Sequence, residues 1–286
     1  SERRINNNPM SRTNKKNAVT FLIALLITMV LLFPMYWILV SSLKTDAEIL
    51  TNRPSFWFKV PRWENYISQL SGSFSLLITA PDSIVTALAN VLITMMLGVP
   101  AAYGLGRYHM KFKKEVILFF LTTQMLPASL LLTPMYLMYS KVGLLNTRLA
   151  PILSIATISI PFTIVVLRPI FKQSPVELEE AARIDGCNTF QVFWKIMLPI
   201  SRPGIVTIAC FSFVHGWNNL IYNMTFNTSS ESRTMTSGIY RLMNEQGTKW
   251  NQIMAYGVIL TLPVIILFIL GQKYIISGMT AGAVKS

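Results

Sequence analysis

The chain has 286 residues, of which 52% are hydrophobic and only 13% are charged. So apolar a composition is typical of a membrane protein rather than a soluble one. Twenty-five lysines and arginines against twelve acidic residues give a formal net charge of +13. Cytoplasmic loops beside anionic lipid account for such a charge, so it indicates no nucleic-acid partner.

Six stretches are long and apolar enough to cross a bilayer as helices, which takes about 20 apolar residues each. They cover residues 19–42, 83–106, 116–139, 149–170, 204–226 and 253–276. The first is too long and lacks the small-residue cleavage site of a signal peptide, so we expect it to stay as an anchor. The predicted fold class is therefore all-α, a polytopic membrane protein with six transmembrane helices.

The basic residues predict the orientation of the chain. With the N-terminus inside, the cytoplasmic segments hold 16 of the 25 lysines and arginines, and the opposite side holds 9. The positive-inside rule then puts both termini in the cytoplasm. We therefore expect a cytoplasmic tail at 1–18, a membrane domain at 19–277 and a second cytoplasmic tail at 278–286.

Two long connections are expected on the external side. The first, residues 44–82, contains aromatic residues that predict an interfacial belt lying on the membrane. These are Phe56, Trp57, Phe58, Trp63 and Tyr66. The second, residues 227–252, is polar, and we interpret it as a solvated loop, with a docking surface for a partner as the alternative.

Between spans four and five lies a segment, residues 174–203, with strong helix signals. Ser174 followed by Glu177 predicts a capping box, with a proline at the first helical position. Acidic residues in the first turns suit the helix macrodipole. One of them, Glu179, is placed one turn before Arg183 and is expected to pair with it.

The same segment predicts a sharp turn and a second short helix. Gly186 is expected to supply a left-handed C-terminal cap. Asn188 with Gln191 repeats the capping pattern, and Pro199 and Pro203 are expected to close the second helix. A rigid, bent element of this kind can dock with little loss of entropy. The alternative is a solvated helical hairpin that only connects two spans.

The sequence lacks the residue patterns that indicate ion coupling, nucleotide binding, metal binding or catalysis. The six predicted spans contain no Asp or Glu, which disfavours a proton- or sodium-coupled carrier. A G-x-x-x-x-G-K-[ST] phosphate loop is also missing, so we expect the chain to bind no cofactor and to receive energy from a partner. His109 and His215 lack partners at metal-ligand spacing, and we expect neither a metal site nor a catalytic site.

The fifth predicted span carries a cluster of polar and aromatic residues that is costly to expose to lipid. Its members are Trp217, Asn218, Asn219, Tyr222 and Asn223. They predict a translocation pathway for a hydroxylated solute, in which amides bond hydroxyl groups and a ring stacks on a sugar face. Hydrogen bonding between helices is an equally good interpretation.

The segment 174–203 also carries a spaced motif: Glu180-Ala181-Ala182, three residues, Gly186, nine residues, and then Ile196-x-Leu198-Pro199. This spacing resembles the signature of the membrane subunits of bacterial binding-protein-dependent ABC importers, where the segment is the coupling loop. With the pair Trp217-Asn218 and the tail from Gly278 to Lys285, the chain resembles the carbohydrate-uptake branch, specifically the maltose-permease G-type subunits, over nearly its whole length.

This resemblance implies a set of partners in a bacterial inner membrane. They are a second, related permease, two cytoplasmic ATPase subunits that use ATP and magnesium, and an external solute-binding protein. The residues implied to couple to the ATPase are Glu180, Ala181, Ala182, Gly186, Ile196, Leu198 and Pro199. In the family, the external loop, here 227–252, reaches the binding protein, and the tail, here 278–286, reaches the ATPase interface.

The function implied is import of a sugar or oligosaccharide by ATP-driven alternating access, with no enzymatic activity of the chain itself. The connection between spans one and two is shorter than in the maltose subunits, so the particular sugar stays open. Three alternatives remain: an importer of another solute such as a glycerol phosphate or a peptide, an assembly or sensor subunit, and a secondary carrier.

Overall fold

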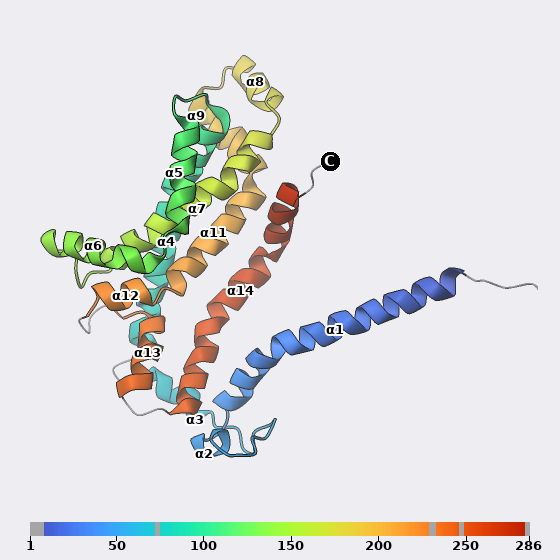
Figure 1. Cartoon of the computed structure of the whole chain (residues 1–286), viewed down its shortest axis with the longest axis vertical. Coiled ribbons are helices and arrows are strands. Elements are labelled where there is room, and N and C mark those ends of the chain that lie inside the picture. Colours follow the sequence, from blue (N-terminus) through green and yellow to red (C-terminus); the bar gives the residue numbers. More distant parts are fainter. Residues whose placement is uncertain (1–8, 72–74, 229–232, 246–248, 284–286) are drawn as a thin grey trace, which may run out of the picture. The chain divides into compact units, whose positions relative to one another are not determined.

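The computed structural model describes residues 9–71, 75–228, 233–245 and 249–283, and every regular element among them is a helix (Figure 1). The helices are α1 (Pro9–Ser42), α2 (Asp46–Ile49), α3 (Glu64–Ile67), α4 (Leu76–Arg107), α5 (Lys113–Met125), α6 (Ala128–Lys141), α7 (Leu149–Gln173), α8 (Glu177–Ile184), α9 (Thr189–Val192), α10 (Leu198–Ile200), α11 (Arg202–Trp217), α12 (Ile221–Phe226), α13 (Met235–Glu245) and α14 (Trp250–Ala283). A 3-10 turn, Ser68–Leu70, and a π-helical turn, Phe193–Met197, complete the set. The predicted all-α class is confirmed.

The chain divides into two compact units. The first comprises Ser1–Ser68 and Lys249–Val258, and the second comprises Gln69–Thr248 and Ile259–Ser286. Helix α14 begins in the first unit and continues into the second. The predicted tails 1–18 and 278–286 fall partly outside the described residues, and their roles stay predictions.

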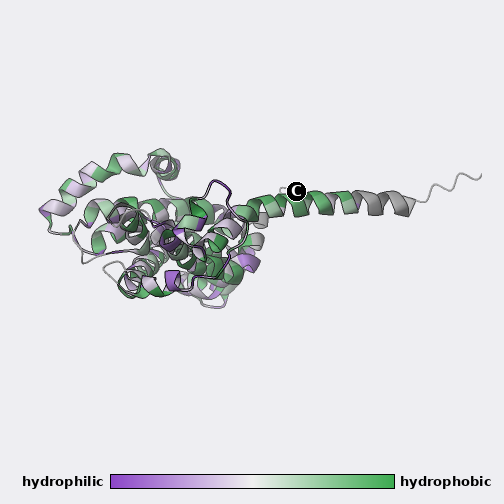
Figure 2. Cartoon of the chain, turned by 90° about the horizontal axis from the view of Figure 1, so that it is seen from below, coloured by the Kyte–Doolittle hydropathy of each residue, from purple (hydrophilic) through white to green (hydrophobic). Residues whose placement is uncertain are grey.

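Helix α1 of the first unit is apolar and its side chains from residue 17 to residue 35 are exposed. Hydrophobic residues predominate along its described part (Figure 2). A helix of this composition needs lipid or another protein around it. The aromatic residues predicted to lie on the membrane belong to the same unit, where Trp57 and Trp63 are 59% and 60% exposed; their contact with lipid stays a prediction.

Capping and hydrogen bonds hold the connection that follows α1. The hydroxyl of Thr45 accepts from the Glu48 amide at 3.3 Å, and the Glu48 carboxylate accepts from the Thr45 amide at 3.0 Å. That amide lowers the pKa of the Glu48 carboxyl below its ordinary value. Asn251, in the first turn of α14, donates its amide to Asp46 at 3.0 Å and its side-chain amide to Asn65 at 2.9 Å.

Helix α4 is the centre of the second unit and packs along α7 and α11. Small residues make the contacts close: a Cβ atom added to Gly98 would lie 2.8 Å from the Thr163 side chain, and one added to Gly216 would lie 2.7 Å from the Ala87 backbone. In lipid, close packing of this kind and interhelical hydrogen bonds drive helix association. Asn90 supplies such bonds, since its side-chain amide reaches Ser159 on α7 and the Ser212 carbonyl on α11.

Among the described residues, four helices, α1, α4, α7 and α14, are long and apolar enough to cross a membrane alone, and up to six spans result if each of two bent helix pairs counts as one. The third predicted span, 116–139, is such a pair: α5 and α6 meet at 99° around Leu126 and Pro127. Proline disfavours a helical conformation in the residue before it, and Leu126 is extended. The polytopic membrane prediction is confirmed, but this span is not a single straight helix.

The second bent pair joins Thr189–Ile200 to α11 at 81°. The fifth predicted span, 204–226, is itself divided after α11. Helix α11 ends at Trp217, and the separate short helix α12 begins at Ile221. The side-chain oxygen of Asn219 accepts a hydrogen bond from the Tyr222 amide at 3.0 Å. This bond satisfies a backbone amide in the first turn of α12, and Asn218 is the C-cap of α11, so the two asparagines lie at the break between the helices.

A carboxylate lies inside a candidate span, contrary to the prediction. Helix α4 begins at Leu76, earlier than residue 83, and therefore includes Asp82. Asp82 is buried, forms an ion pair with Arg148 at 2.6 Å, and accepts from the Arg233 amide at 3.0 Å. The neighbouring Ser83 accepts from the Met235 amide at 2.7 Å. This end of α4 thus joins the start of α7 to the segment leading into α13.

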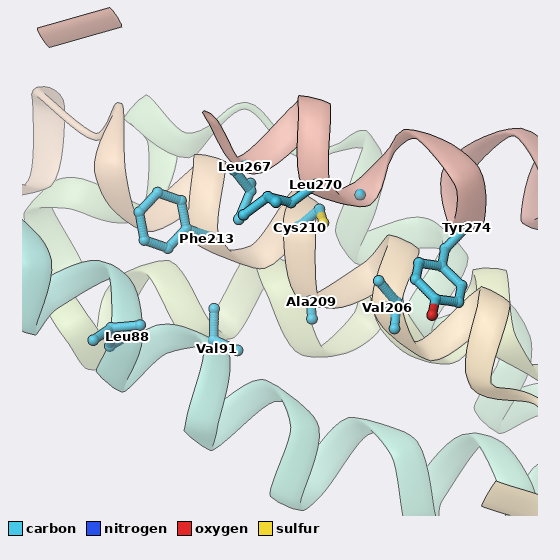
Figure 3. Close-up of a pocket in the computed structure, with 10 residues that line it drawn as sticks. Leu88, Val91, Val206, Ala209, Cys210, Phe213, Leu267, Leu270 and Tyr274 are labelled. Carbon is cyan, nitrogen blue, oxygen red and sulfur yellow. The ribbon is translucent and has the colours of Figure 1, made fainter. Parts of the chain in front are cut away.

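An apolar groove of about 320 Å³ lies between α4, α11 and α14 in the second unit (Figure 3). Its walls include Val91, Phe213 and Leu267, and Tyr274 lies at one end of the row of labelled side chains. The Tyr274 carbonyl accepts from Thr207 at 3.3 Å. The lining is almost entirely hydrocarbon, so this groove is not suited to a polar solute.

The contact between α4 and α11 predicts unequal effects of two small substitutions. Gly216→Ala places a methyl group against the backbone of Ala87, and we expect overpacking to lower the free energy of unfolding by about 1–3 kcal/mol. Gly104→Ala, on α4, adds the same group where no atom lies within 4 Å. There we expect no loss, and a gain of up to about 1 kcal/mol from helix propensity.

Thermal unfolding of the purified protein in detergent measures both effects. Equal melting temperatures for the two variants would contradict the close approach of α4 and α11.

Candidate functional site

The segment predicted to be the coupling loop, residues 174–203 and called by that name below, contains α8, a glycine turn and α9 and lies at one end of the bundle formed by α4, α7 and α11 (Figure 1). Gly186 has a φ of +85°, which favours glycine. Its amide donates to the Arg183 carbonyl at 3.0 Å, and the Cys187 amide donates to the Ala182 carbonyl at 2.9 Å. The predicted left-handed cap after the first helix is therefore present.

The predicted capping box at Ser174 is wrong. Helix α8 begins only at Glu177, with Val176 in helical conformation at its N-cap. The Ser174 hydroxyl donates instead to the Ile170 carbonyl at 3.0 Å, at the end of α7. Serine readily bonds a carbonyl four residues earlier, and here that local bond outcompetes the box. The second box is correct, because Asn188 and Gln191 exchange hydrogen bonds at 2.8 and 2.9 Å.

The expected stop at Pro199 is wrong as well. The chain passes from α9 through the π-helical turn into α10, which contains Pro199. The break falls at Ser201, where the helices on either side meet at 81°. Pro203 lies in the first turn of α11, where a missing amide hydrogen costs nothing, so it starts a helix rather than closing one.

The signature residues of the coupling loop differ in exposure. Glu180, Ala181 and Gly186 are exposed, whereas Ala182 is buried. In the second half, Ile196 and Leu198 pack against the apolar core beneath the loop, and Pro199 is exposed. The signature therefore combines surface positions with positions that attach the coupling loop to the bundle. We call the exposed part of this loop around Gly186, from α8 to α9, the corner.

Large apolar side chains stand on the surface of this corner. Ile184, at the end of α8, is 86% exposed, and Leu178 is 42% exposed. Phe190 and Trp194 are 68% and 55% exposed, and their ring centroids lie 6.0 Å apart. Large exposed apolar side chains of this kind are typical of a surface that a protein partner or lipid covers.

Glu179 turns inward from α8 and does not form the predicted pair with Arg183. Its carboxylate accepts from Nε of Arg107, at the end of α4, at 2.6 Å, and from the Tyr103 hydroxyl at 3.2 Å. Arg107 also donates to the Pro175 carbonyl at 3.1 Å. The side chains of Arg107 and Glu179 are only 9% and 10% exposed. The sequence could not reveal this pair, because 72 residues separate its members.

An aromatic core supports the ion pair. The Tyr103 ring contacts those of Phe171 on α7 and Phe193 in the π-helical turn, with centroids 5.5 and 5.0 Å apart. Both phenylalanines are buried. Tyr103 therefore connects three elements at the base of the coupling loop.

The five residues predicted to form a pathway are split between two environments. Trp217 is 1% exposed and donates its indole N–H to the Leu260 carbonyl on α14 at 3.0 Å. Tyr222 is fully buried and stacks on Phe226, and the Asn223 side chain donates to the Asn219 carbonyl at 2.5 Å. Trp217 thus joins α11 to α14, and Tyr222 packs in an apolar cluster with Tyr139 of α6 and Ile155 of α7. Asn223 holds the turn that precedes its own helix, α12.

Asn218 and Asn219 instead line a cavity of about 350 Å³. The other walls are His215 and Val214 from α11 and two isoleucines, Ile155 and Ile158, from α7. Asn218 is exposed. A cavity with two amides, an imidazole and apolar walls can hydrogen-bond a neutral polar solute while burying its carbon faces.

Within the described ranges, no three His, Cys, Asp or Glu side chains gather as metal ligands would.

The chain matches a known protein family and resembles several of its members in sequence. Residues 94–281 match the family described as "Binding-protein-dependent transport system inner membrane component". The chain is 34% identical to the sulfoquinovosyl glycerol transport system permease protein SmoH of Agrobacterium fabrum, over 89% of each chain. It is 32% identical to the trehalose/maltose transport system permease protein MalG of Thermococcus litoralis, over 92% of this chain and 94% of that protein.

Among solved structures, the crystal structure of a bacterial ABC transporter involved in the import of the acidic polysaccharide alginate is similar in fold. The TM-score is 0.78 with 22% sequence identity, covering 92% of this chain and 98% of that chain. The family match over residues 94–281 contains both the coupling loop and the residues that line the cavity beside Asn218. The chain therefore belongs to the family of binding-protein-dependent transport system inner membrane components.

Proposed function

We propose that this chain is the membrane-spanning permease subunit of a bacterial ATP-binding-cassette importer for a sugar or oligosaccharide. It forms half of the translocation pathway, and a second permease subunit forms the other half. A solute-binding protein delivers the sugar from outside. Two cytoplasmic ATPase subunits hydrolyse ATP with magnesium, and the chain itself is a transport subunit rather than an enzyme.

The observation that carries this proposal is the exposed apolar corner of the coupling loop. Ile184 and Phe190 stand on the surface on either side of the rigid glycine turn at Gly186. A hard-capped corner loses little entropy when it docks, and its apolar side chains favour a protein partner. The ATPase is the partner that the family requires on this side, and alternating access follows from the displacement of the corner when the ATPase subunits close.

A sugar is the substrate class that the comparisons and the cavity support together. The two relatives are described as permeases for a sulfoquinovosyl glycerol and for trehalose or maltose. The cavity beside Asn218 and Asn219 has amide groups for hydroxyls and apolar walls for the carbon face of a ring. The distribution of basic residues supports an orientation with both termini in the cytoplasm, which leaves the coupling loop on the ATPase side.

The first prediction concerns docking at the corner. Ile184→Asp puts a charge where a large apolar side chain is buried by the partner, and we expect the ATPase to bind about tenfold or more weakly. Copurification of the ATPase with the tagged permease measures the change.

Val142→Asp is the matched control, because Val142 is 67% exposed on the connection between α6 and α7. It should leave copurification unchanged. Full ATPase recovery with Ile184→Asp would exclude the corner as the docking surface.

The second prediction separates the pathway from the packing residues. Asn218→Ala removes an exposed amide from the cavity, and we expect transport to fall about two- to tenfold, the value of one hydrogen bond, at unchanged thermal stability. Asn223→Ala removes a buried amide that bonds the Asn219 carbonyl, and we expect it to lower the melting temperature.

Uptake of radiolabelled sugar into proteoliposomes and thermal unfolding in detergent give the two readouts. A loss of stability with Asn218→Ala and unchanged uptake per folded complex would assign that residue to packing.

The third prediction concerns the energy source, because Asp82 lies within a candidate span. Its carboxylate is already held by Arg148 and the Arg233 amide, so we expect it to carry no transported proton. Uptake should require hydrolysable ATP inside the vesicles and persist when a protonophore removes the proton gradient. Uptake that stops with the protonophore at constant ATP would indicate a secondary carrier.

A further inference from the structure

The coupling loop is attached to the bundle in two ways that differ in rigidity. On the side of α11, the chain turns by 81° at the single residue Ser201, where a helix is interrupted. On the side of α7, the chain leaves the bundle through Ser174 and Pro175. There the loop is also tied to α4 by the buried pair of Arg107 and Glu179.

The ion pair holds α8 at more than one point. Arg107 bonds Glu179 within α8 at 2.6 Å and the Pro175 carbonyl before α8 at 3.1 Å. Tyr103, one turn earlier on α4, bonds the second carboxylate oxygen of Glu179 at 3.2 Å. Three hydrogen bonds in different directions leave α8 little freedom to rotate or slide against the end of α4.

At this end, helix α4 also packs closely against α7 and is hydrogen-bonded to it. A Cβ atom added to Gly106 would lie 3.1 Å from the Phe171 side chain, and Arg168 donates to the Leu105 carbonyl at 3.2 Å. The end of α4, the end of α7 and α8 therefore form one interlocked group. A displacement of α8 must carry α4 with it as long as the ion pair is intact.

We propose that the Arg107–Glu179 ion pair is the connection through which α8 moves helix α4, so that it determines the coupling of ATP hydrolysis to transport and not the docking of the ATPase. This inference rests on the proposed function. Both residues are positioning residues, because their buried side chains face the bundle and leave the exposed side chain of Ile184 to meet the partner.

The test is a set of three variants in the reconstituted complex of permeases, ATPases and binding protein. Arg107→Met and Glu179→Met each leave one buried charge without its partner, so we expect both to lower thermal stability. The double variant removes both charges and replaces them with apolar groups of similar length, which restores stability. If the ion pair served only to stabilise the fold, the double variant would therefore transport sugar normally.

We expect the double variant to keep the ATPase bound and hydrolysing but to transport about fivefold or more less sugar per ATP hydrolysed. Glu177→Gln is the control, since Glu177 lies on the exposed side of α8 and should keep the wild-type ratio. A wild-type ratio in the double variant, or loss of the ATPase from it, would overturn the proposal. The second outcome would mean that the pair serves docking.

A distance measurement tests the same connection without any sugar. Spin labels are placed at exposed positions by Glu177→Cys on α8 and Leu97→Cys on α4, with Cys187 and Cys210 replaced by alanine. ATP should leave the distance between the labels unchanged when the ion pair is present and change it in the double variant. A distance that changes on ATP binding with the pair intact would also overturn the proposal.

The wild-type complex tests the proposed function, and the variants test the role of the ion pair. A wild-type chain that retains no ATPase refutes the proposed function before any variant is compared. A wild-type complex that couples ATP hydrolysis to uptake upholds that function, and the three variants then decide the role of the ion pair.

Discussion

The close contact of α4 with α7 and α11 is the constraint on which the second unit depends. In a membrane, lipid is as apolar as the helices, so association needs close van der Waals contact and hydrogen bonds instead of a hydrophobic driving force. Gly98 and Gly216 allow that contact, and Asn90 adds hydrogen bonds to both neighbours. Since the three helices have little room to slide, both ends of α4 become fixed points to which surface segments can attach.

The two ends of α4 use ion pairs of different character. At one end Asp82 is buried, but the side chain of its partner Arg148 is 56% exposed, so the arginine keeps much of its hydration. At the other end Arg107 and Glu179 are both nearly buried. Two buried charges hold each other in one geometry because either of them alone would be strongly unfavourable there. The stricter geometric requirement lies at the end that carries the coupling loop.

Asparagine side chains in the second unit occur in two settings, in hydrogen bonds that hold the fold and in the wall of a cavity. The residue type alone does not tell these settings apart. Asn90 joins α4 to α7 and α11, and Asn223 holds the turn before α12, whereas Asn218 lines a cavity. An amide is tolerated at membrane depth in either setting, provided that its groups find partners in protein, water or solute. At the end of α11, the adjacent residues Trp217 and Asn218 lie in different surroundings, because Trp217 bonds α14 and Asn218 lines the cavity.

Local signals in the sequence were sufficient for the helical class, the apolar spans, the glycine cap at Gly186 and the second capping box at Asn188, because each depends on residues within one or two turns. Local signals also misled where two of them competed: Ser174 closes α7 instead of opening α8, and Pro127 bends a span that hydropathy alone makes continuous. The partner of Glu179 was decided only by the tertiary structure. A helical pair with Arg183 was available, but the folded bundle brings Arg107 to the same carboxylate in a buried setting, where a charge-assisted hydrogen bond is stronger than one exposed to water.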